Sequence, residues 1–288
     1  MQSVILGCGD IGRRVVKALL SQGHRVEDII GFVRSTPSTE LCAKLGVIGL
    51  RFDLDKLNRD LSVCADSDLY YMVAPQKSGV TDERTKALLT HFSEQSIQPN
   101  KVVLISTTGV YGDCGGQWVT EENETNPQTE RGKRRLDAEQ QWLAWGKRAH
   151  VPVVVLRVPG IYANSRLPKE RIAKKIPVVR SEECGFTNRI HADDLALMCV
   201  LAMRKAKAGE VFNATDGTPG KITEYLQEAA KVLGLESPPQ ISLSEGKSVL
   251  SSGMLSYLSE SRKISNNKIR EELSFDLRYP DFKEGIKY

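Results

Sequence analysis

The sequence predicts an α/β fold built on a doubly wound parallel sheet, and three observations predict it. Short β-branched runs alternate with segments of helical period through the first half of the chain, and a glycine-rich turn joins the first run to the first helical segment. The 288 residues are also 40% hydrophobic, which is enough for a packed core. Regular alternation of strand and helix is typical of a parallel sheet covered by helices on both faces.

The elements of the first half can be placed in order along the chain. Six short apolar runs are expected to be strands: residues 3–6, 29–33, 47–52, 69–73, 102–106 and 153–157. Segments with apolar residues at helical spacing lie between them and are expected to be helices: 11–22, 81–95 and 130–148. Residues 1–157 are therefore predicted to form a Rossmann domain.

The pattern changes after residue 157. Loops and a basic segment come first, followed by a helix, a strand and two further helices at residues 193–204, 210–213, 223–233 and 266–273. We expect residues 158–288 to form mainly a smaller substrate-binding lobe, with segments near 190–213 returning to the first domain. Such a lobe would grow from the carboxyl ends of the strands, where ligands bind in this architecture.

The turn after the first strand contains a G-x-G-x-x-G motif that opens a helix. Gly7 permits the tight turn, Gly9 lets the backbone approach a pyrophosphate, and Gly12 allows close packing of helix on strand. Asp10 and Ile11 begin the helix, whose free N–H groups and positive end attract phosphates. The motif predicts a dinucleotide site formed by these five residues.

The residue after the second strand bears on the choice of cofactor. A site for NAD usually has an acidic residue roughly 20 residues beyond the glycines, which binds the ribose 2′-hydroxyl. Here Arg34 stands at that place and Ser35 follows it. A guanidinium with a neighbouring hydroxyl suits a 2′-phosphate, so NADP is expected rather than NAD. The alternative is that Arg34 is a solvated loop cation.

Composition and charge argue against several other classes of protein. The 40 basic and 36 acidic side chains give a net charge of +4, which is too balanced for a typical nucleic-acid binder. Six scattered cysteines, no basic leader and no apolar stretch near 20 residues predict a cytoplasmic protein that does not bind a membrane. No ligand spacing predicts a metal. We expect a small-molecule substrate, and the chain is expected to be a monomer or a homodimer.

Five further motifs carry a resemblance to a known family. They lie at residues 52–55, 73–75, 106–112, 156–162 and 189–194. With them the chain resembles the extended short-chain dehydrogenase/reductases, and specifically their atypical NAD(P)-dependent epimerase/dehydratase-like members, over nearly its whole length. The resemblance implies that Asp53 and Leu54 meet the adenine ring and that Val73 and Ala74 line the ribose and pyrophosphate. It further implies that Thr107 is the active-site Ser/Thr and that Pro159 lies in the loop that touches the nicotinamide.

The sequence departs from that family at its catalytic pair. Active members carry Tyr-x-x-x-Lys on the helix after the fifth strand, where the Tyr transfers the proton and the Lys lowers its pKa and holds the nicotinamide ribose. Here Arg131 stands at the Tyr position and Arg135 at the Lys position. Arg135 can still donate to ribose hydroxyls. Arg131 does not titrate at ordinary pH, but it can bind an anionic substrate or stabilise an oxyanion.

Four other side chains are candidates for contact with the substrate, and each has a structural alternative. The Thr108 hydroxyl can bind the substrate or its own backbone, and Tyr111 can replace the missing phenol or pack beneath the loop. His191 and Arg189 can face the substrate, or they can order the loop before a helix that Asp193 or Asp194 caps.

Two functions remain open on the sequence alone. The first is an NADP-dependent oxidoreductase or epimerase-like enzyme with altered acid/base chemistry, acting on a small polar substrate such as a sugar- or nucleotide-linked one. The second is a catalytically silent NADP-binding protein that senses the cofactor or binds a partner. The two differ in whether any acid can act where Arg131 replaces the Tyr.

Overall fold

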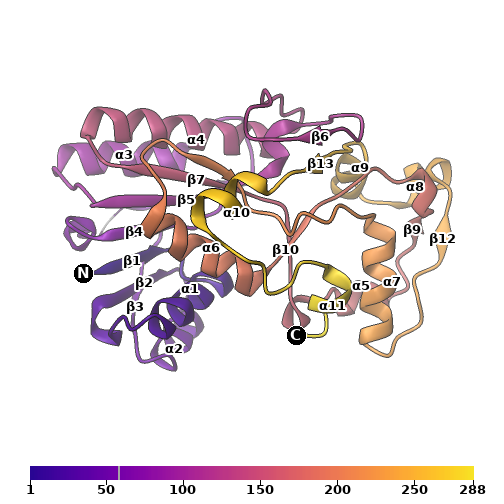
Figure 1. Cartoon of the computed structure of the whole chain (residues 1–288), viewed down its shortest axis with the longest axis horizontal. Coiled ribbons are helices and arrows are strands. Elements are labelled where there is room, and N and C mark those ends of the chain that lie inside the picture. The colour runs from indigo at the N-terminus through magenta and orange to yellow at the C-terminus, as the bar shows by residue number, and fades with distance from the viewer. Residues whose placement is uncertain (58) are drawn as a thin grey trace.

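The computed structural model describes residues 1–57 and 59–288, and its centre is a seven-stranded parallel sheet (Figure 1). The strands lie in the order β11-β7-β5-β4-β1-β2-β3. Their bounds are β1 Ser3–Leu6, β2 Ile29–Val33, β3 Ile48–Arg51, β4 Asp68–Tyr71, β5 Lys101–Thr107, β7 Val153–Val158 and β11 Val211–Asn213. The chain runs outward from β1 to β3, then crosses back to β4 on the other side of β1. This order defines a doubly wound Rossmann fold, as predicted.

Helices cover both faces of the sheet. Figure 1 shows α3 (Glu83–Glu94) and α4 (Glu130–Ala149) on one face, and α1 (Asp10–Ser21), α2 (Thr36–Ala43) and α6 (Ala192–Lys205) on the other. Apolar side chains fill the space between the sheet and the helices on each face. On the face covered by α3 and α4, an aromatic cluster is formed by Tyr71, Phe92, Trp142 and Trp145. No helix in residues 1–57 or 59–288 is long and apolar enough to cross a membrane.

The predicted strands and helices of the first half all occur, with bounds that differ by one or two residues. The sequence indicated neither β6 (Trp118–Val119), which has two residues, nor α2. Its composition, Thr-Pro-Ser-Thr in the first four residues, is typical of a turn, and it buries only Cys42. A helix that presents so little apolar surface leaves no periodic signal in the sequence.

The second half both completes the sheet and forms a separate lobe. β11 pairs with β7, and α6 and α10 (Asn267–Leu273) pack near it, so these segments belong to the Rossmann body. The lobe, at the right of Figure 1, has its own apolar core around Tyr162, Tyr225 and Phe282. Its elements are α5 Lys169–Ala173, β9 Val178–Val179, α7 Ile222–Val232, β12 Gln240–Ile241, α8 Leu243–Val249, α9 Ser252–Leu258 and α11 Phe282–Gly285.

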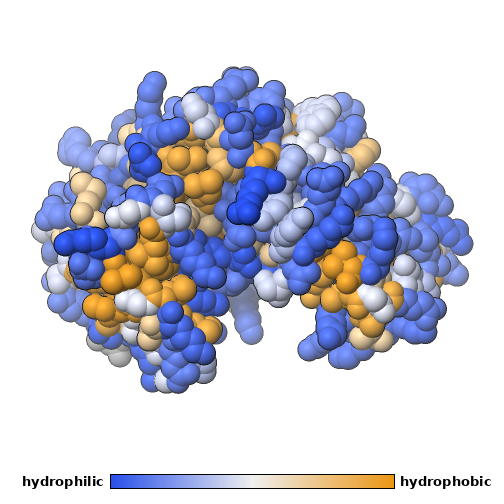
Figure 2. Space-filling view, turned by 60° about the horizontal axis from the view of Figure 1, so that its bottom comes forward, coloured by the Kyte–Doolittle hydropathy of each residue, from blue (hydrophilic) through white to orange (hydrophobic). Residues whose placement is uncertain are grey.

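Short parallel pairs join the lobe to the body. β8 (Gly160–Tyr162) pairs with β10 (Arg189–His191), and β6 (Trp118–Val119) pairs with β13 (Lys263–Ile264). Figure 2 shows that apolar side chains gather in separate areas of the larger body and the smaller lobe, with hydrophilic side chains between them. The junction on this face is therefore polar.

A buried ion pair fixes α4 on the sheet. Arg157 of β7 donates from Nη2 to Glu139 Oε2 at 2.9 Å, and the two side chains are 8% and 2% exposed. Arg157 Nη1 also donates to the Tyr111 hydroxyl at 3.0 Å, which in turn donates to Asn213 of β11 at 2.9 Å. Burial lowers the pKa of Arg157, but its bonds to Glu139 more than offset this and leave that pKa above its usual value. The network ties α4 to both β7 and β11.

We expect Glu139→Ala to lower the free energy of unfolding by about 3–5 kcal/mol, because it leaves Arg157 buried without its counter-charge. Urea denaturation followed by circular dichroism measures the change. Lys133→Ala, on the exposed side of the same helix, is the control and should change stability by less than about 0.5 kcal/mol. A loss below about 1 kcal/mol for Glu139→Ala would show that the pair does not anchor the helix.

Candidate functional site

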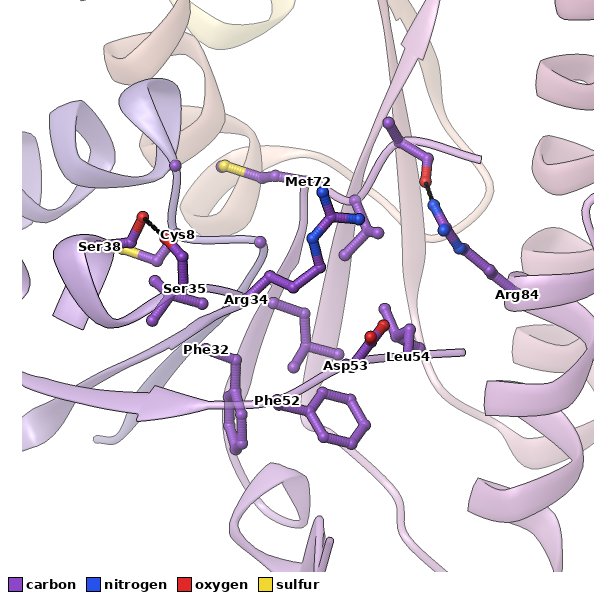
Figure 3. Close-up of a pocket in the computed structure, with 16 residues that line it drawn as sticks. Cys8, Phe32, Arg34, Ser35, Ser38, Phe52, Asp53, Leu54, Met72 and Arg84 are labelled. Atoms are coloured by element: carbon purple, nitrogen blue, oxygen red, sulfur yellow. Dashed lines mark hydrogen bonds between the residues drawn. The ribbon is translucent and has the colours of Figure 1, made fainter. Parts of the chain in front are cut away.

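Two cavities lie along the carboxyl edge of the parallel sheet. The first has a volume of about 420 Å³ and is lined by residues at the ends of β1, β2, β3 and β4 (Figure 3). The second has a volume of about 350 Å³ and lies at the ends of β5 and β7, between α4 and the lobe. The first cavity borders the point where the strand order reverses on the two sides of β1, which is where ligands bind in open α/β sheets.

The glycine turn forms one wall of the first cavity. Gly7 has φ +88°, and a Cβ there would lie 3.0 Å from the Met72 backbone carbon, so only glycine fits. At Gly9 a Cβ would meet nothing closer than the Gly7 carbonyl oxygen at 3.9 Å. The chain itself therefore does not require glycine at position 9, and the space in front of it is open to a ligand.

The first turn of α1 continues from that wall. Gly12 packs closely on the sheet, since a Cβ there would lie 3.1 Å from Ile5 Cγ2. Asp10 accepts a hydrogen bond from Arg166 of the lobe at 2.6 Å. Burial raises the pKa of Asp10, but this bond and the charges of Arg14, Arg166 and Arg13 lower it below its usual value overall. Asp10, Ile11 and Gly12 lie beside the residues that line the cavity rather than among them.

Arg34 and two serines form the wall that follows β2. Figure 3 shows the Arg34 guanidinium turned into the cavity, with Ser35 and Ser38 on one side and Asp53 on the other. Among the described residues, no carboxylate lies within ion-pair distance of Arg34. The other arginine of this cavity, Arg84, is already engaged by Asp55 and by the Ala74 carbonyl at 3.0 Å. Arg34 is thus the cation that remains available to a ligand here.

An apolar slot completes the first cavity. Phe32 and Phe52 meet edge to face with ring centroids 5.7 Å apart, and Leu54 is buried beside them. The Asp53 carboxylate accepts from the backbone N–H of Asp55 at 3.2 Å. Asp53, Leu54, Val73 and Ala74, which the sequence assigned to the cofactor, all line this one cavity.

The second cavity brings together the residues expected at the reacting end. It is lined by Thr107 at the end of β5, Thr108 in the turn that follows, Arg131 and Arg135 from α4, and Pro159 after β7. Thr107 caps a 3-10 turn by accepting from the Gly109 N–H at 3.2 Å, which leaves its hydroxyl proton free to be donated. Arg131 is exposed, whereas Arg135 is partly buried.

Arg135 connects the two cavities. It lines the second cavity, and its Nη1 donates to the carbonyl of Val73 in the first at 3.1 Å. Burial is the largest influence on this guanidinium and lowers its pKa below the usual value. An extended ligand that occupies both cavities would pass Arg135 on the way.

Three of the candidate substrate contacts, Tyr111, Arg189 and His191, make structural contacts of the kind given as their alternatives. Tyr111 is 1% exposed with its hydroxyl bonded to Asn213 and Arg157, and burial raises its pKa. Arg189 lies over the Tyr225 ring at 4.2 Å. His191 accepts from the Asp193 N–H, capping α6, and stacks on Tyr279 at 3.9 Å. None of the three lines either cavity among the described residues.

Six further residues line the second cavity and were not recognised from the sequence. They are Phe186, Thr187 and Asn188 before β10, together with Tyr257, Glu260 and Arg262 from α9 and the segment after it. The pairing of β13 with β6, together with hydrogen bonds from Asn188 and Cys114, holds the segment after α9 at this end of the sheet. Two-residue strands carry no periodic pattern, so no signal in the sequence could have placed it.

Comparison with known proteins identifies the family and the fold of this chain. The model of the NAD dependent epimerase/dehydratase family matches residues 4–215, and the chain belongs to that family. A functionally unknown conserved protein from Silicibacter pomeroyi DSS is similar in structure, with a TM-score of 0.84 and 30% identity over 99% of this chain and 96% of that one.

Two solved enzymes share the fold at lower identity. UDP-glucuronic acid 4-epimerase from Bacillus cereus, in complex with NAD, has a TM-score of 0.75 and 20% identity over 100% of this chain and 96% of that one. dTDP-glucose 4,6-dehydratase from Bacillus anthracis str. Ames, also in complex with NAD, has a TM-score of 0.77 and 19% identity over 100% of this chain and 94% of that one. No curated protein sequence matches the chain. The family membership supports a nicotinamide dinucleotide as the cofactor.

We expect Gly9→Val to abolish binding of NADPH and NADH while the protein stays folded, because the new side chain enters the space open to a pyrophosphate and contacts little else. Fluorescence titration measures binding, and circular dichroism checks the fold. Gly253→Val is the matched control, since a Cβ there also has open space. If Gly9→Val unfolds the protein instead, Gly9 has a structural role.

Proposed function

We propose that this protein binds NADP in the two cavities and acts as an oxidoreductase or epimerase-like enzyme on a small polar substrate. The observation that carries the proposal is the hydrogen bond by which Arg135 of the second cavity reaches Val73 of the first. Arg135 therefore lies where the two cavities approach one another, and a dinucleotide that occupied both would pass beside it. A bound nicotinamide would supply or accept a hydride at the second cavity.

Different residues of the chain would bind different parts of the cofactor. The slot formed by Phe32, Phe52 and Leu54 would hold the adenine, with Asp53 at its edge. The glycine turn and the first N–H groups of α1 would hold the pyrophosphate. Arg135 would donate to the nicotinamide ribose, and Pro159 would contact the ring. Residues 1–157 would then provide most of the cofactor site, and 158–288 mainly the lobe that covers the substrate.

The preference for NADP rests on Arg34. The two enzymes compared above hold NAD, so the argument depends on what this chain has at the end of β2. A guanidinium unpaired among the described residues, with Ser35 and Ser38 beside it, offers donors to a 2′-phosphate. An NAD site would instead need an acceptor for the 2′-hydroxyl at this place.

A sugar- or nucleotide-linked substrate fits the second cavity. One similar structure, MoeE5, was determined with UDP-glucose and NAD. In this chain the cavity is lined by hydroxyl, amide and guanidinium groups, including those of Thr107, Asn188 and Arg131. Polar substrates are bound by such groups, and an anionic part would lie against the arginines. The six free cysteine thiols support a reducing, cytoplasmic setting.

The proton donor differs from that of the family. A guanidinium is a poor proton donor, so Arg131 would act through its charge on an oxyanion or an anionic group. Tyr111 does not line the second cavity. Tyr257 is the tyrosine that lines the cavity among the described residues. We propose Tyr257 as the acid, with the Thr107 hydroxyl as a donor to the reacting oxygen.

The second candidate function is a silent NADP-binding protein. It is favoured by one observation, that guanidinium groups occupy both positions of the Tyr/Lys pair. Such a protein would bind the cofactor with the same residues and transfer no hydride, serving as a sensor or binding a partner.

Arg34→Ala tests the choice of cofactor. We expect NADPH to bind the native protein more tightly than NADH by about 1.5–3 kcal/mol, from charge-assisted bonds to the 2′-phosphate, and the variant to lose most of that difference. Arg25→Ala, at the opposite end of β2, is the control. Equal affinities of the native protein in a fluorescence titration would refute the role of Arg34.

Single variants of the arginine pair and of Tyr257 test catalysis. Arg135→Ala should weaken NADPH binding about tenfold or more, because a charged donor to the ribose is lost. Arg131→Ala and Tyr257→Phe should leave binding nearly unchanged and lower kcat, since their interactions form with the reacting substrate. Hydride transfer from C4-deuterated NADPH to small ketones and sugar nucleotides measures turnover.

Restoring the family pair separates the two candidate functions. If the double variant Arg131→Tyr/Arg135→Lys transfers hydride and the native protein does not, the silent-binder function is correct. If native turnover persists in Arg131→Ala, Arg131 does not act at the chemical step.

A further inference from the structure

Two cysteine thiols meet beside the glycine turn, and the proposed function does not use them. Cys8 belongs to the turn, between Gly7 and Gly9. Cys42 lies on α2. Their sulfurs are 3.8 Å apart, within hydrogen-bond distance, and both side chains are fully buried. Cys8 also lines the first cavity (Figure 3), so the thiol pair is directly linked to the wall of that cavity.

The sheet lets the two sulfurs meet because it has a glycine at two neighbouring positions. Gly31 of β2 and Gly49 of β3 are register partners. A Cβ at Gly31 would lie 2.9 Å from Cys8 Sγ and 3.4 Å from Cys42 Sγ. A Cβ at Gly49 would lie 3.0 Å from Cys42 Cβ. Glycine weakens a strand, and these two mark the close approach of the thiol pair to the sheet.

The surroundings of the pair make one thiol more reactive than the other. The hydrogen bond between the sulfurs has the largest influence, and it lowers the pKa of Cys42 and raises that of Cys8. Burial opposes the ionisation of each thiol, whereas the positive charge of Arg13 favours it. The thiolate is the nucleophilic form of cysteine. Cys42 is therefore the thiol that reacts first with an oxidant, and Cys8 is placed to react with the product.

Access to the buried pair is through α2. Cys42 is the only buried side chain among the eight residues of this helix. A helix of that length is marginal by itself, and an element with few buried contacts opens locally at a small cost in free energy. Opening of α2 exposes Cys42 and uncovers the neighbouring Cys8, so a small oxidant can reach the thiols although they are buried in the closed structure.

We propose that Cys8 and Cys42 form a reversible redox site, in which hydrogen peroxide joins them in a disulfide that weakens dinucleotide binding in the first cavity. The Cys42 thiolate attacks one peroxide oxygen, the O–O bond breaks, and hydroxide takes up a proton and leaves as water. Cys8 then attacks the sulfur of the Cys42 sulfenic acid, the S–O bond breaks, and a second water leaves. Two thiols and one peroxide thus give one disulfide and two waters.

The disulfide changes the wall of the first cavity. An S–S bond is about 2 Å long, so bond formation draws α2 and the turn together by about 2 Å. The turn is tied to β2, since the N–H groups of Gly7 and Cys8 donate to the Phe32 carbonyl at 3.1 and 2.8 Å. α2 is therefore the part that moves, and it carries Ser38 of the cavity wall with it. Such a shift exceeds the roughly 0.5 Å that a binding site tolerates.

Peptide mapping of the full-length protein tests the disulfide. The reduced protein is treated with hydrogen peroxide, alkylated and digested with trypsin in the absence of reductant. We expect peptide 1–13, which contains Cys8, to be linked to peptide 35–44, which contains Cys42, and dithiothreitol to separate them. Cys42→Ser should abolish the link. Cys64→Ser is the matched control and should leave it, because Cys64 is equally buried but burial raises its pKa to about 12.

Fluorescence titration with NADPH tests the effect on binding, which rests on the proposed function. We expect peroxide to raise the Kd about tenfold or more and dithiothreitol to restore it, because the cavity wall is displaced only in the disulfide form. Cys42→Ser should bind NADPH with the native Kd before and after peroxide, since Cys42 is not among the described residues that line the cavity. Cys42→Ala gives the same test should the buried serine destabilise the fold.

Two results would overturn the inference. Peroxide that leaves Cys8 and Cys42 unlinked, or that links Cys42 to another cysteine, would refute the redox site. A disulfide that forms while the Kd for NADPH stays unchanged would refute its effect on binding. If the reduced native protein binds neither NADPH nor NADH, the proposed function is wrong, and the linked peptides by themselves still support or refute the redox site.

Discussion

The placement of α4 is the constraint on which the candidate site depends. Its two arginines reach the second cavity only because the helix is fixed over the ends of β5 and β7. The buried bond between Glu139 and Arg157 fixes the middle of the helix. At its N-terminus a Cβ at Gly132 would lie 2.9 Å from the Gly109 carbonyl oxygen, so the helix begins in direct contact with the loop after β5. Arg135, between these two points, thereby reaches the carbonyl of Val73.

The same helix carries the two residues at which we propose that the site departs from its family. Replacing a Tyr and a Lys by two arginines preserves donors for a ribose and removes the titratable phenol. It also changes the electrostatics, because the second cavity now holds guanidinium groups on both the α4 side and the lobe side. A cavity of this kind favours an anionic ligand whether or not it supports hydride transfer.

The lobe contributes side chains to the second cavity that the Rossmann body does not provide there. Its segment from Tyr257 to Arg262 brings a phenol, a carboxylate and a guanidinium to a cavity whose other wall has hydroxyls and arginines. This segment is anchored to the body by β13 on β6 and by the side chain of Asn188. Arg166 of the lobe likewise bonds to Asp10 beside the glycine turn. Contacts from the lobe therefore reach both the glycine turn and the second cavity.

The sequence by itself determined the fold, and it predicted the residues that line the first cavity, because both depend on local patterns. Strands β1 and β2 are continuous runs of buried residues, which the sequence shows directly. The glycines between β1 and α1 are needed for the tight turn from strand to helix, so their spacing can be recognised in the sequence. The family match at residues 4–215 agrees with that reading. Arg34 was likewise placed by its distance along the chain from the glycines.

Only the tertiary structure showed which residues line the second cavity. Tyr111, Arg189 and His191 looked like candidates because they are polar and near motifs, yet each is buried in a structural contact that its sequence neighbours do not reveal. Tyr257, Glu260 and Arg262 carried no signal, since they lie 69 or more residues along the chain from the rest of the cavity wall (257 − 188 = 69) and are followed by a strand of only two residues. A site assembled from distant segments is set by packing, and packing leaves no periodic trace in the sequence.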